Sequence, residues 1–340
     1  GGGKGAVRSS SIFIQQRHGD LLISWSASLD AFIWDRGPAI LNQHIFKVVE
    51  RSHLVDRRYL FYAVREVMDE IRSQTHGATM RHIRKGEFEA TQIPLPPLDA
   101  QRRIAAILDE QMAAVEQARA AAEAQLEAAQ SLMAAYLREV FESEEAQGWD
   151  AVPLRVILRR RTEIVYPRDN PSGSATFVGL EHIVSDTGVR RGQYDLEKSQ
   201  LTGRKPRFYA GDIVYGYLRP YLNKVWIAEF DGLCSVDQYA FEVNRSLADT
   251  EFVAWFMRSP VYMERSPIGS NTSQLPRVRL DEVLSVEINL PPLSIQRDCA
   301  HRIGSAAEDI LETQQALQDQ LDAIGALPAS LLRRAFSGEL

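Results

Sequence analysis

The stretch IPLPPLDAQRR, at residues 93–103, returns as INLPPLSIQRD at residues 288–298. The offset of 195 positions holds without a gap across residues 93–141 and 288–336. Self-similarity of this kind is the sequence signature of a structural unit that occurs more than once. We therefore expect the same supersecondary element twice in this chain.

Both copies have the pattern of a long amphipathic helix. Asp99 and Ser294 follow the Pro-Pro pair of each copy, and both are residue types that favour the N-cap of a helix. Apolar residues then recur every seven positions, as in a coiled-coil seam. The seam residues of the first copy are Leu108, Val115, Ala122, Ala129 and Tyr136, and those of the second are Ile303, Ile310, Leu317, Ile324 and Leu331.

The two seams complement each other in size. Small alanines in the first copy match Leu317 and Ile324 in the second, and large residues facing small ones let two helices interdigitate. We expect helices of roughly 60 Å that pair as an antiparallel coiled coil. Gly325 and Pro328 predict a break or kink, with Pro328 opening a short terminal helix.

The segments around the helices have the pattern of small α+β domains. Residues 151–290 hold short β-rich runs at 212–217, 224–229 and 238–243, and then a helix at 249–263. The first segment repeats this order, with strands at 20–24, 31–34 and 44–49 and a helix around 56–73. Gly19-Asp20-Leu21 also resembles Gly211-Asp212-Ile213 at an offset of 192. The fold class is therefore α+β, with globular domains alternating with long helices.

Composition is that of a globular protein, with 45% hydrophobic and 25% charged residues. Counting Lys and Arg against Asp and Glu, residues 93–150 have a net charge of −7 and residues 293–340 of −3, whereas residues 1–92 have +3 and 151–292 have +1. The acidity thus lies in the helical segments. No apolar run is long enough to span a membrane, and two cysteines without metal-ligand spacing indicate the cytoplasm.

Motifs for catalysis are missing from the sequence. It has neither an Asn/Asp-Pro-Pro-Tyr/Phe methyltransferase motif nor a phosphate-binding glycine loop. No lysine follows a carboxylate by two residues, so the commonest nuclease motif is absent as well. We therefore expect no catalytic residue and no metal site in this chain.

The order domain, helix, domain, helix resembles the DNA specificity subunit of type I restriction–modification systems. The resemblance rests on the Pro-Leu-Pro-Pro-Leu-x-x-Gln-Arg motif (94–102, with 290–297 matching), the Gly-Asp block, residues 41–46 (LNQHIF) and residues 330–338 (SLLRRAFSG). It covers nearly the whole chain.

The resemblance implies four segments. These are a first target recognition domain at 1–92, a first long helix at 93–146, a second recognition domain at 147–290, and a second long helix at 291–340 that is kinked near 325–328. Trp149 lies 62 residues before Gly211, whereas 18 residues precede Gly19. We therefore expect the first recognition domain to be incomplete at its N-terminus.

The resemblance also implies a division of labour. Each recognition domain reads one half of a split sequence in double-stranded DNA, and the helices set the separation of the domains and dock two modification (methyltransferase) subunits. A further restriction (translocase) subunit cleaves DNA. S-adenosylmethionine, ATP and Mg²⁺ would then be used by the partner subunits, with no cofactor bound by this chain.

Candidate DNA contacts are basic and polar residues in loops, because such residues contact phosphates and base edges. In the second domain they are Arg204, Lys205, Arg207, Arg219, Tyr221, Lys224, Gln274, Arg277 and Arg279, and their first-domain counterparts are Thr79, Arg81, Arg84 and Lys85. Solvated loops are the alternative for each of these tracts. The tract Arg159-Arg160-Arg161 is either a phosphate contact or a solvated helix end.

A second hypothesis remains open from the sequence. The net acidity and weak basic patches also suit a structural coiled-coil adaptor whose globular ends bind protein. Co-purification with a methyltransferase would favour the first hypothesis, and protein partners unrelated to DNA would favour the second.

Overall fold

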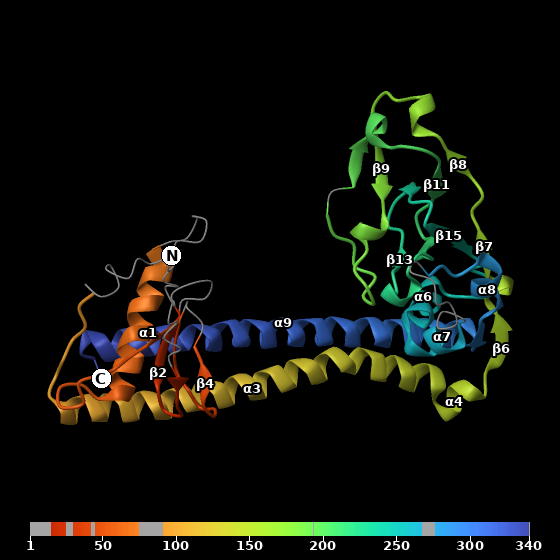
Figure 1. The fold of residues 1–340 in the computed structure, drawn as a ribbon. Coiled ribbons are helices and arrows are strands. Elements are labelled where there is room, and N and C mark those ends of the chain that lie inside the picture. Colours follow the sequence, from red (N-terminus) through yellow and green to blue (C-terminus); the bar gives the residue numbers. More distant parts are fainter. Residues whose placement is uncertain are drawn as a thin grey trace, which may run out of the picture. The chain divides into compact units, whose positions relative to one another are not determined.

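The computed structural model describes residues 15–24, 30–41, 45–74, 91–192, 194–266 and 276–339 (Figure 1). The chain forms two compact units. One comprises residues 1–125 and 317–340, and the other comprises residues 126–316. Each unit therefore combines one globular domain with one half of each long helix.

The two long helices confirm the expectation from the repeat. Helix α3 spans Leu98–Glu142 and α9 spans Leu293–Ser337, so each has 45 residues and their ends match under the shift of 195. Both begin one residue before the expected N-caps, Asp99 and Ser294. The first turn instead closes on proline carbonyls, since Gln101 donates its backbone N–H to Pro97 at 3.0 Å and Gln296 to Pro292 at 3.1 Å.

The expected break at Gly325 and Pro328 does not occur, because α9 runs through both residues. Pro328 cannot donate a helical hydrogen bond. Buried apolar contacts on both sides of it hold the helix in place: Ile324 packs with Val115 and Ala122, while Leu332 packs with Leu108. No separate terminal helix forms.

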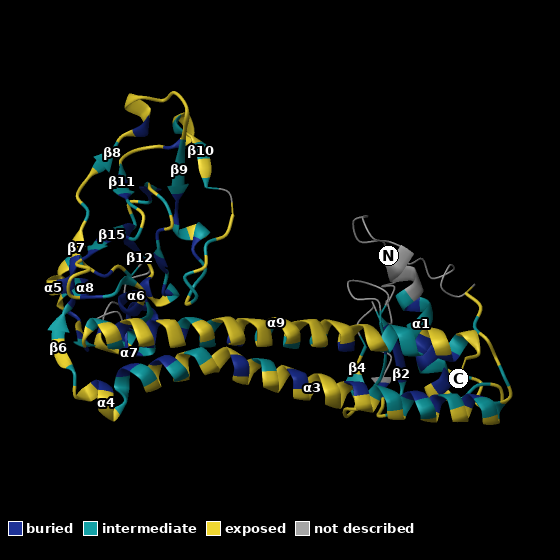
Figure 2. Ribbon diagram, turned by 180° about the vertical axis from the view of Figure 1, so that it is seen from behind, coloured by how far each residue is buried: buried dark blue, intermediate teal, exposed yellow. Residues whose placement is uncertain are grey.

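The helices pack antiparallel, as the order of their contacts within each unit shows. In the first unit Leu108 meets Leu332, and in the second Leu137 and Ile303 belong to the same core. Seven of the ten expected seam residues are buried, namely Leu108, Val115, Ala122, Ala129, Ile303, Ile310 and Ile324, whereas Tyr136, Leu317 and Leu331 are half-buried. Figure 2 shows that the outward faces of both helices are largely exposed.

The first domain is built on a three-stranded sheet of order β3-β2-β5. Its described elements are β1 (Gln15–Gln16), β2 (Leu21–Ser24), β3 (Asp30–Ile33), β4 (Ala39–Ile40), β5 (Ile45–Lys47) and α1 (Arg57–Gln74). Leu21, Ile23 and Met68 bury the contact between this sheet and α1. Tyr59 and Ala63 of α1 then pack on Ala105 of α3.

The second domain contains two larger sheets, of order β10-β9-β14-β11-β8 and β13-β12-β15-β7. Its strands are β6 (Asp150–Pro153), β7 (Leu158–Arg160), β8 (Ile164–Val165), β9 (Ser174–Val178), β10 (Asp195–Glu197), β11 (Lys205–Phe208), β12 (Ile213–Gly216), β13 (Val225–Ile227), β14 (Gly232–Cys234), β15 (Gln238–Val243) and β16 (Glu287–Leu290). Its helices are α4 (Glu144–Gln147), α5 (Leu154–Ile157), α6 (Thr250–Arg258), α7 (Pro260–Arg265) and α8 (Leu280–Ser285), with 3-10 turns η1 (Pro167–Asp169), η2 (Leu180–His182), η3 (Lys198–Gln200) and η4 (Pro220–Leu222). The fold class predicted from sequence is confirmed.

The single helix expected at 249–263 is divided into α6 and α7. Ser259 adopts an extended conformation (φ −75°, ψ 154°) because the residue before a proline disfavours the helical region. Its hydroxyl caps α7 by accepting a hydrogen bond from the backbone of Tyr262. Phe252 and Phe256 of α6 pack against Phe141 of α3, at ring-centroid distances of 5.3 and 5.4 Å.

The repeat extends from the helices into both domains. The central strand β2 pairs with β3 and β5, just as β12 pairs with β13 and β15. Gly19 and Gly211 both have positive φ, at 86° and 85°. Each donates its backbone N–H at 2.7 Å to the carbonyl of the residue directly after the neighbouring strand, Trp34 after β3 and Ala228 after β13. The two domains therefore share a three-stranded core, and in each the same glycine turn directly precedes the central strand.

A buried glutamine joins each domain to its long helix. Gln101 Nε2 donates to the carbonyls of Leu54 (3.0 Å) and Pro96 (2.7 Å), while its Oε1 accepts from the backbone N–H of Asp56 (2.8 Å). Gln101 is 0% exposed.

Gln296 repeats each of these three hydrogen bonds. It donates to Leu247 (3.0 Å) and Pro291 (2.7 Å) and accepts from Asp249 (2.7 Å), and it too is 0% exposed. Asp56 and Asp249 in turn cap α1 and α6. Each joint thus links the start of a long helix to the capped start of a domain helix.

We predict that Gln296→Met lowers the free energy of unfolding by about 1–3 kcal/mol, because three backbone groups at the joint, among them the buried carbonyl of Pro291, lose their hydrogen-bond partner. Urea denaturation of the purified chain measures this change. The control is Gln318→Met, since exposed Gln318 bonds to Asp322 one turn away and to no other residue among those described. Equal stability of the two variants would show that the hydrogen bonds of Gln296 do not stabilise the fold.

We also predict that Ile324→Asp destabilises the chain by about 3 kcal/mol or more, because a carboxylate would replace an apolar side chain buried against Val115 and Ala122. Leu327→Asp, at a position 43% exposed on the same helix, should change stability little. Thermal unfolding followed by circular dichroism compares them. A melting temperature unaffected by Ile324→Asp would disprove this pairing of the helices.

Candidate nucleic-acid interface

Two stacked tyrosines lie at one end of the four-stranded sheet of the second domain. Tyr217 follows β12 directly, and Tyr239 lies near the start of β15, which is the antiparallel neighbour of β12. Their rings stack at 4.3 Å between centroids, with 24° between the planes. The hydroxyl of Tyr217 donates to the carbonyl of Val236 at 2.6 Å. This pairing fixes both rings on rigid strands.

Arginines surround the two rings. Arg160, at the end of β7, places its guanidinium 5.2 Å from the centre of the Tyr239 ring. Burial raises the pKa of the Tyr217 hydroxyl, while the charges of Arg277, Arg160 and Arg204 act to lower that pKa. The charges of three arginines from separate segments therefore act on the same phenol, against the opposing charge of Asp237.

The segment around Arg277 is held against the end of β12. Leu218 and Arg277 form an isolated β-bridge, and the backbone N–H of Arg219 donates to Pro276 at 2.8 Å. Arg219 adopts the left-handed conformation (φ 52°) where the chain turns into η4. We call the set Arg160, Arg204, Tyr217, Arg219, Tyr239 and Arg277 the arginine–tyrosine surface.

Acidic groups balance part of this charge. Asp237 lies 3.6 Å from the Arg277 guanidinium, whose side chain is 59% exposed. Arg279 caps the start of α8 and contacts Asp281 and Glu282. The surface keeps an excess of arginine, and a guanidinium suits the recognition of phosphate and guanine.

The structure divides the sequence-predicted contacts into two groups. Arg204, Arg219, Tyr221 and Arg277 are exposed. Lys205, Arg207 and Lys224 instead bind their own domain: Lys205 donates to Thr202 (2.6 Å), Lys224 to Leu180 (2.6 Å), and Arg207 pairs with Glu163 (3.0 Å). Thr79, Arg81, Arg84, Lys85 and Gln274 lie outside the described residues.

The tract at 159–161 is neither a helix end nor uniformly exposed. Arg159 and Arg160 belong to strand β7. Arg161 makes a bidentate ion pair with buried Asp212, with Nε–Oδ2 and Nη2–Oδ1 distances of 3.0 Å. Only Arg160 belongs to the arginine–tyrosine surface, and β-strand alternation, which turns successive side chains to opposite faces, explains the difference.

Two members of this surface, Tyr217 and Tyr239, were absent from the sequence-predicted contacts, and Arg160 was named only within the tract 159–161, with a solvated helix end as the alternative. Each lies inside or beside a strand, whereas the prediction favoured loops. The sequence held little signal for Tyr239: the strand Gln238–Val243 does not alternate strictly, since Ala240 and Phe241 are both buried, although Tyr239 itself lies between two buried residues. Among the described residues, no three His, Cys, Asp or Glu side chains are arranged to hold a metal ion, and no helix is long and apolar enough to cross a membrane.

Known proteins resemble the chain along most of its length. A family model described as "Type I restriction modification DNA specificity domain" matches residues 3–127. The specificity subunit of the type I restriction enzyme EcoDI from Escherichia coli is 26% identical over 334 residues, which cover 87% of this chain and 74% of that subunit. The corresponding MjaVIII subunit of Methanocaldococcus jannaschii is 25% identical, over 89% of this chain and 75% of that subunit.

Solved structures share the fold. A chain from work on complex assembly and conformational transition of the type I R-M system has a TM-score of 0.76 and 19% identity, covering 96% of this chain and 83% of that one. The crystal structure of the HsdS subunit from Thermoanaerobacter tengcongensis has a TM-score of 0.60 and 18% identity, over 96% of this chain and 82% of that one. At such identities the likeness is one of fold alone.

We predict that Arg161→Ala and Arg277→Ala differ in stability. The first leaves buried Asp212 without its guanidinium and should cost about 2 kcal/mol, whereas the second removes an exposed side chain and should cost about 0.5 kcal/mol or less. Chemical denaturation of both variants tests this. A large loss of stability in Arg277→Ala would make that residue structural rather than available for binding.

Proposed function

We propose that the chain, which is similar to type I restriction enzyme specificity subunits along most of its length, is the subunit that reads a bipartite sequence in double-stranded DNA and directs partner subunits to it. The arginine–tyrosine surface is the observation that carries this proposal. Its side chains come from five segments of the second domain. Arg160 and Tyr239 stand on paired strands, and the segments of Tyr217, Arg219 and Arg277 are bonded to one another at the end of β12, which makes this part of the surface rigid enough to select between bases.

The chemistry of the surface fits DNA. A guanidinium can donate two hydrogen bonds to the O6 and N7 of guanine in the major groove, and one such contact discriminates between bases by about 1–3 kcal/mol. Other arginines bind phosphates and fix the register of the domain. Arg277 is our candidate for reading a base, and Arg204 is our candidate for a phosphate contact.

The internal repeat supports a target of two halves. Both domains carry the same strand order around a Gly-Asp turn and the same buried glutamine at the start of a long helix. Two domains with the same strand order and the same attachment to a long helix would each read one half-site. The helix pair would then set the number of unread base pairs between the half-sites.

The partners supply the chemistry in this proposal. Two modification subunits would methylate adenine with S-adenosylmethionine, and a restriction subunit would use ATP and Mg²⁺ to translocate and cleave DNA. The chain itself would bind no cofactor and catalyse no step. Its two cysteines are unpaired and buried, which fits the reducing cytoplasm as the place where it acts.

The test is DNA selection by the chain in complex with its modification subunits. We predict that Arg277→Ala weakens binding to the preferred sequence by about 1–3 kcal/mol and relaxes the preference at one base position. Arg204→Ala should weaken binding to all DNA sequences by the same factor and reduce the dependence of the affinity on salt concentration. Fluorescence anisotropy at several fixed salt concentrations measures both effects.

Arg155→Ala is the matched control for this experiment. Arg155 is exposed, and it lines a hollow at the opposite end of the sheet, where β12 begins and β15 ends. A wild-type complex without sequence preference would overturn the proposed function and favour a structural adaptor. If Arg277→Ala lowers the affinity for every DNA sequence by the same factor, Arg277 contacts phosphate and does not read a base.

A further inference from the structure

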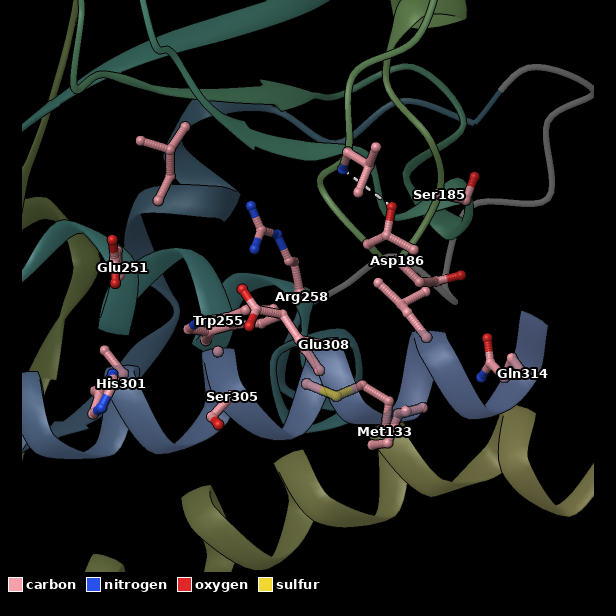
Figure 3. A pocket seen from close by; sticks show the side chains of 18 of the residues that line it. Met133, Ser185, Asp186, Glu251, Trp255, Arg258, His301, Ser305, Glu308 and Gln314 are labelled. Atoms are coloured by element: carbon pink, nitrogen blue, oxygen red, sulfur yellow. Dashed lines mark hydrogen bonds between the residues drawn. The ribbon is translucent and has the colours of Figure 1, made fainter. Parts of the chain in front are cut away.

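A cleft of about 680 Å³ lies between the second domain and α9, entirely within one compact unit (Figure 3). Its floor is a stripe of α9 residues from Ala300 to Gln314, which at 1.5 Å per residue is about 21 Å long. Gly304, Ser305 and Ala307 on this floor are small residues, so few side-chain atoms project from α9 into the cleft. One wall is the segment 185–189, and the other is the end of α6.

A buried cation lines this cleft. Arg258, the last residue of α6, is only 8% exposed, and its guanidinium lies 4.7 Å from the centre of the Trp255 ring. Its Nε donates to the carbonyl of Val225 at 3.0 Å. Neither terminal nitrogen of Arg258 has a hydrogen bond or an ion pair to any described residue. Burial lowers the pKa of Arg258 to about 10, and Glu251 opposes this shift.

The position of Arg258 is fixed by its surroundings. A Cβ on Gly188 would come within 2.1 Å of Arg258 Nη2, so the side chain lies directly against this glycine. Asn223 holds the backbone of the same residue, because its Nδ2 donates to the Arg258 carbonyl at 2.7 Å. A buried cation without a carboxylate carries a large desolvation cost, which an anion from a partner would offset.

Charges at the rim have the opposite sign. Glu251 of α6 and Glu308 of α9 are exposed and line the cleft together with Arg258 (Figure 3). Leu311, which is 42% exposed, and half-buried Met133 add apolar surface. The cleft thus offers one deep cation, an acidic rim and an apolar, elongated floor. A small anion would use only the first of these features.

We propose that this cleft is a docking site for a segment of the modification subunit, which inserts a carboxylate side chain toward Arg258 and lays apolar residues along α9. Basic residues flanking that carboxylate would face Glu251 and Glu308. The inference rests on the proposed function, since it assigns a position and a chemistry to the contact with the modification subunit. A segment of protein fits the length of the floor better than a compact ligand.

Gly304 provides a test that leaves the rest of the fold intact. A Cβ at Gly304 would meet nothing within 4 Å, and leucine favours a helix over glycine, so Gly304→Leu should fill the cleft without destabilising the chain. Gly325→Leu is the matched control, because Gly325 is also in α9, has equally open space and does not line the cleft. Arg258→Met removes the cation and keeps an unbranched side chain of similar reach.

The measurement is the affinity of each purified variant for the modification subunit of the same system, by isothermal titration calorimetry, with thermal unfolding as a check on folding. Gly304→Leu and Arg258→Met should each weaken binding at least tenfold, and Gly325→Leu less than twofold. Glu308→Lys should also weaken binding, whereas Asp309→Lys, at the adjacent exposed position outside the cleft, should not.

Three outcomes would overturn the inference. If Gly304→Leu binds the modification subunit as the wild type does, the cleft is not the docking site and the proposed function stands. If Gly304→Leu instead weakens DNA binding by the chain, the occupant is DNA. A wild-type chain that binds neither the modification subunit nor DNA would overturn the proposed function and this inference with it.

Discussion

The rest of the structure depends on the hydrogen bonds of two buried glutamines, Gln101 and Gln296. Each side chain is wholly inaccessible to water, and each bonds to two backbone carbonyls and one backbone N–H. A buried amide without partners is costly, so the domain groups that bond to each glutamine stabilise the start of the long helix at this position. The joint therefore couples the domain fold to the position of the helix.

This coupling explains how a mostly exposed helix pair can serve a recognition protein. Polar residues cover the outward faces of α3 and α9, and only a narrow seam is buried (Figure 2). The domains add the missing apolar contacts at the helix ends, through Tyr59 and Ala63 in one unit and Phe252 and Phe256 in the other. Helix and domain stabilise each other, and the sheet next to the arginine–tyrosine surface is thereby anchored to the long helices.

Burial also separates arginines with different roles in the second domain. Arg161 neutralises buried Asp212, Arg190 lies 3.9 Å from the centre of the Tyr194 ring and pairs with Glu229, and Arg258 lies in the cleft beside α9. Arg160 and Arg277 face solvent. Residue type alone is therefore a poor guide to DNA contact in this chain, because arginine here also holds the fold together.

The sequence by itself determined the duplication, the two long helices and the α+β class, because a repeat at a constant offset and a heptad pattern are local properties of the chain. It failed where tertiary contacts override local preference. Pro328 predicts a break, yet buried Ile324 and Leu332 carry α9 through it. Lys224 predicts a solvent-facing contact, yet it bonds to the carbonyl of Leu180. The arginine–tyrosine surface was decided by tertiary structure alone, since antiparallel pairing of β12, β15 and β7 brings together side chains far apart in the sequence.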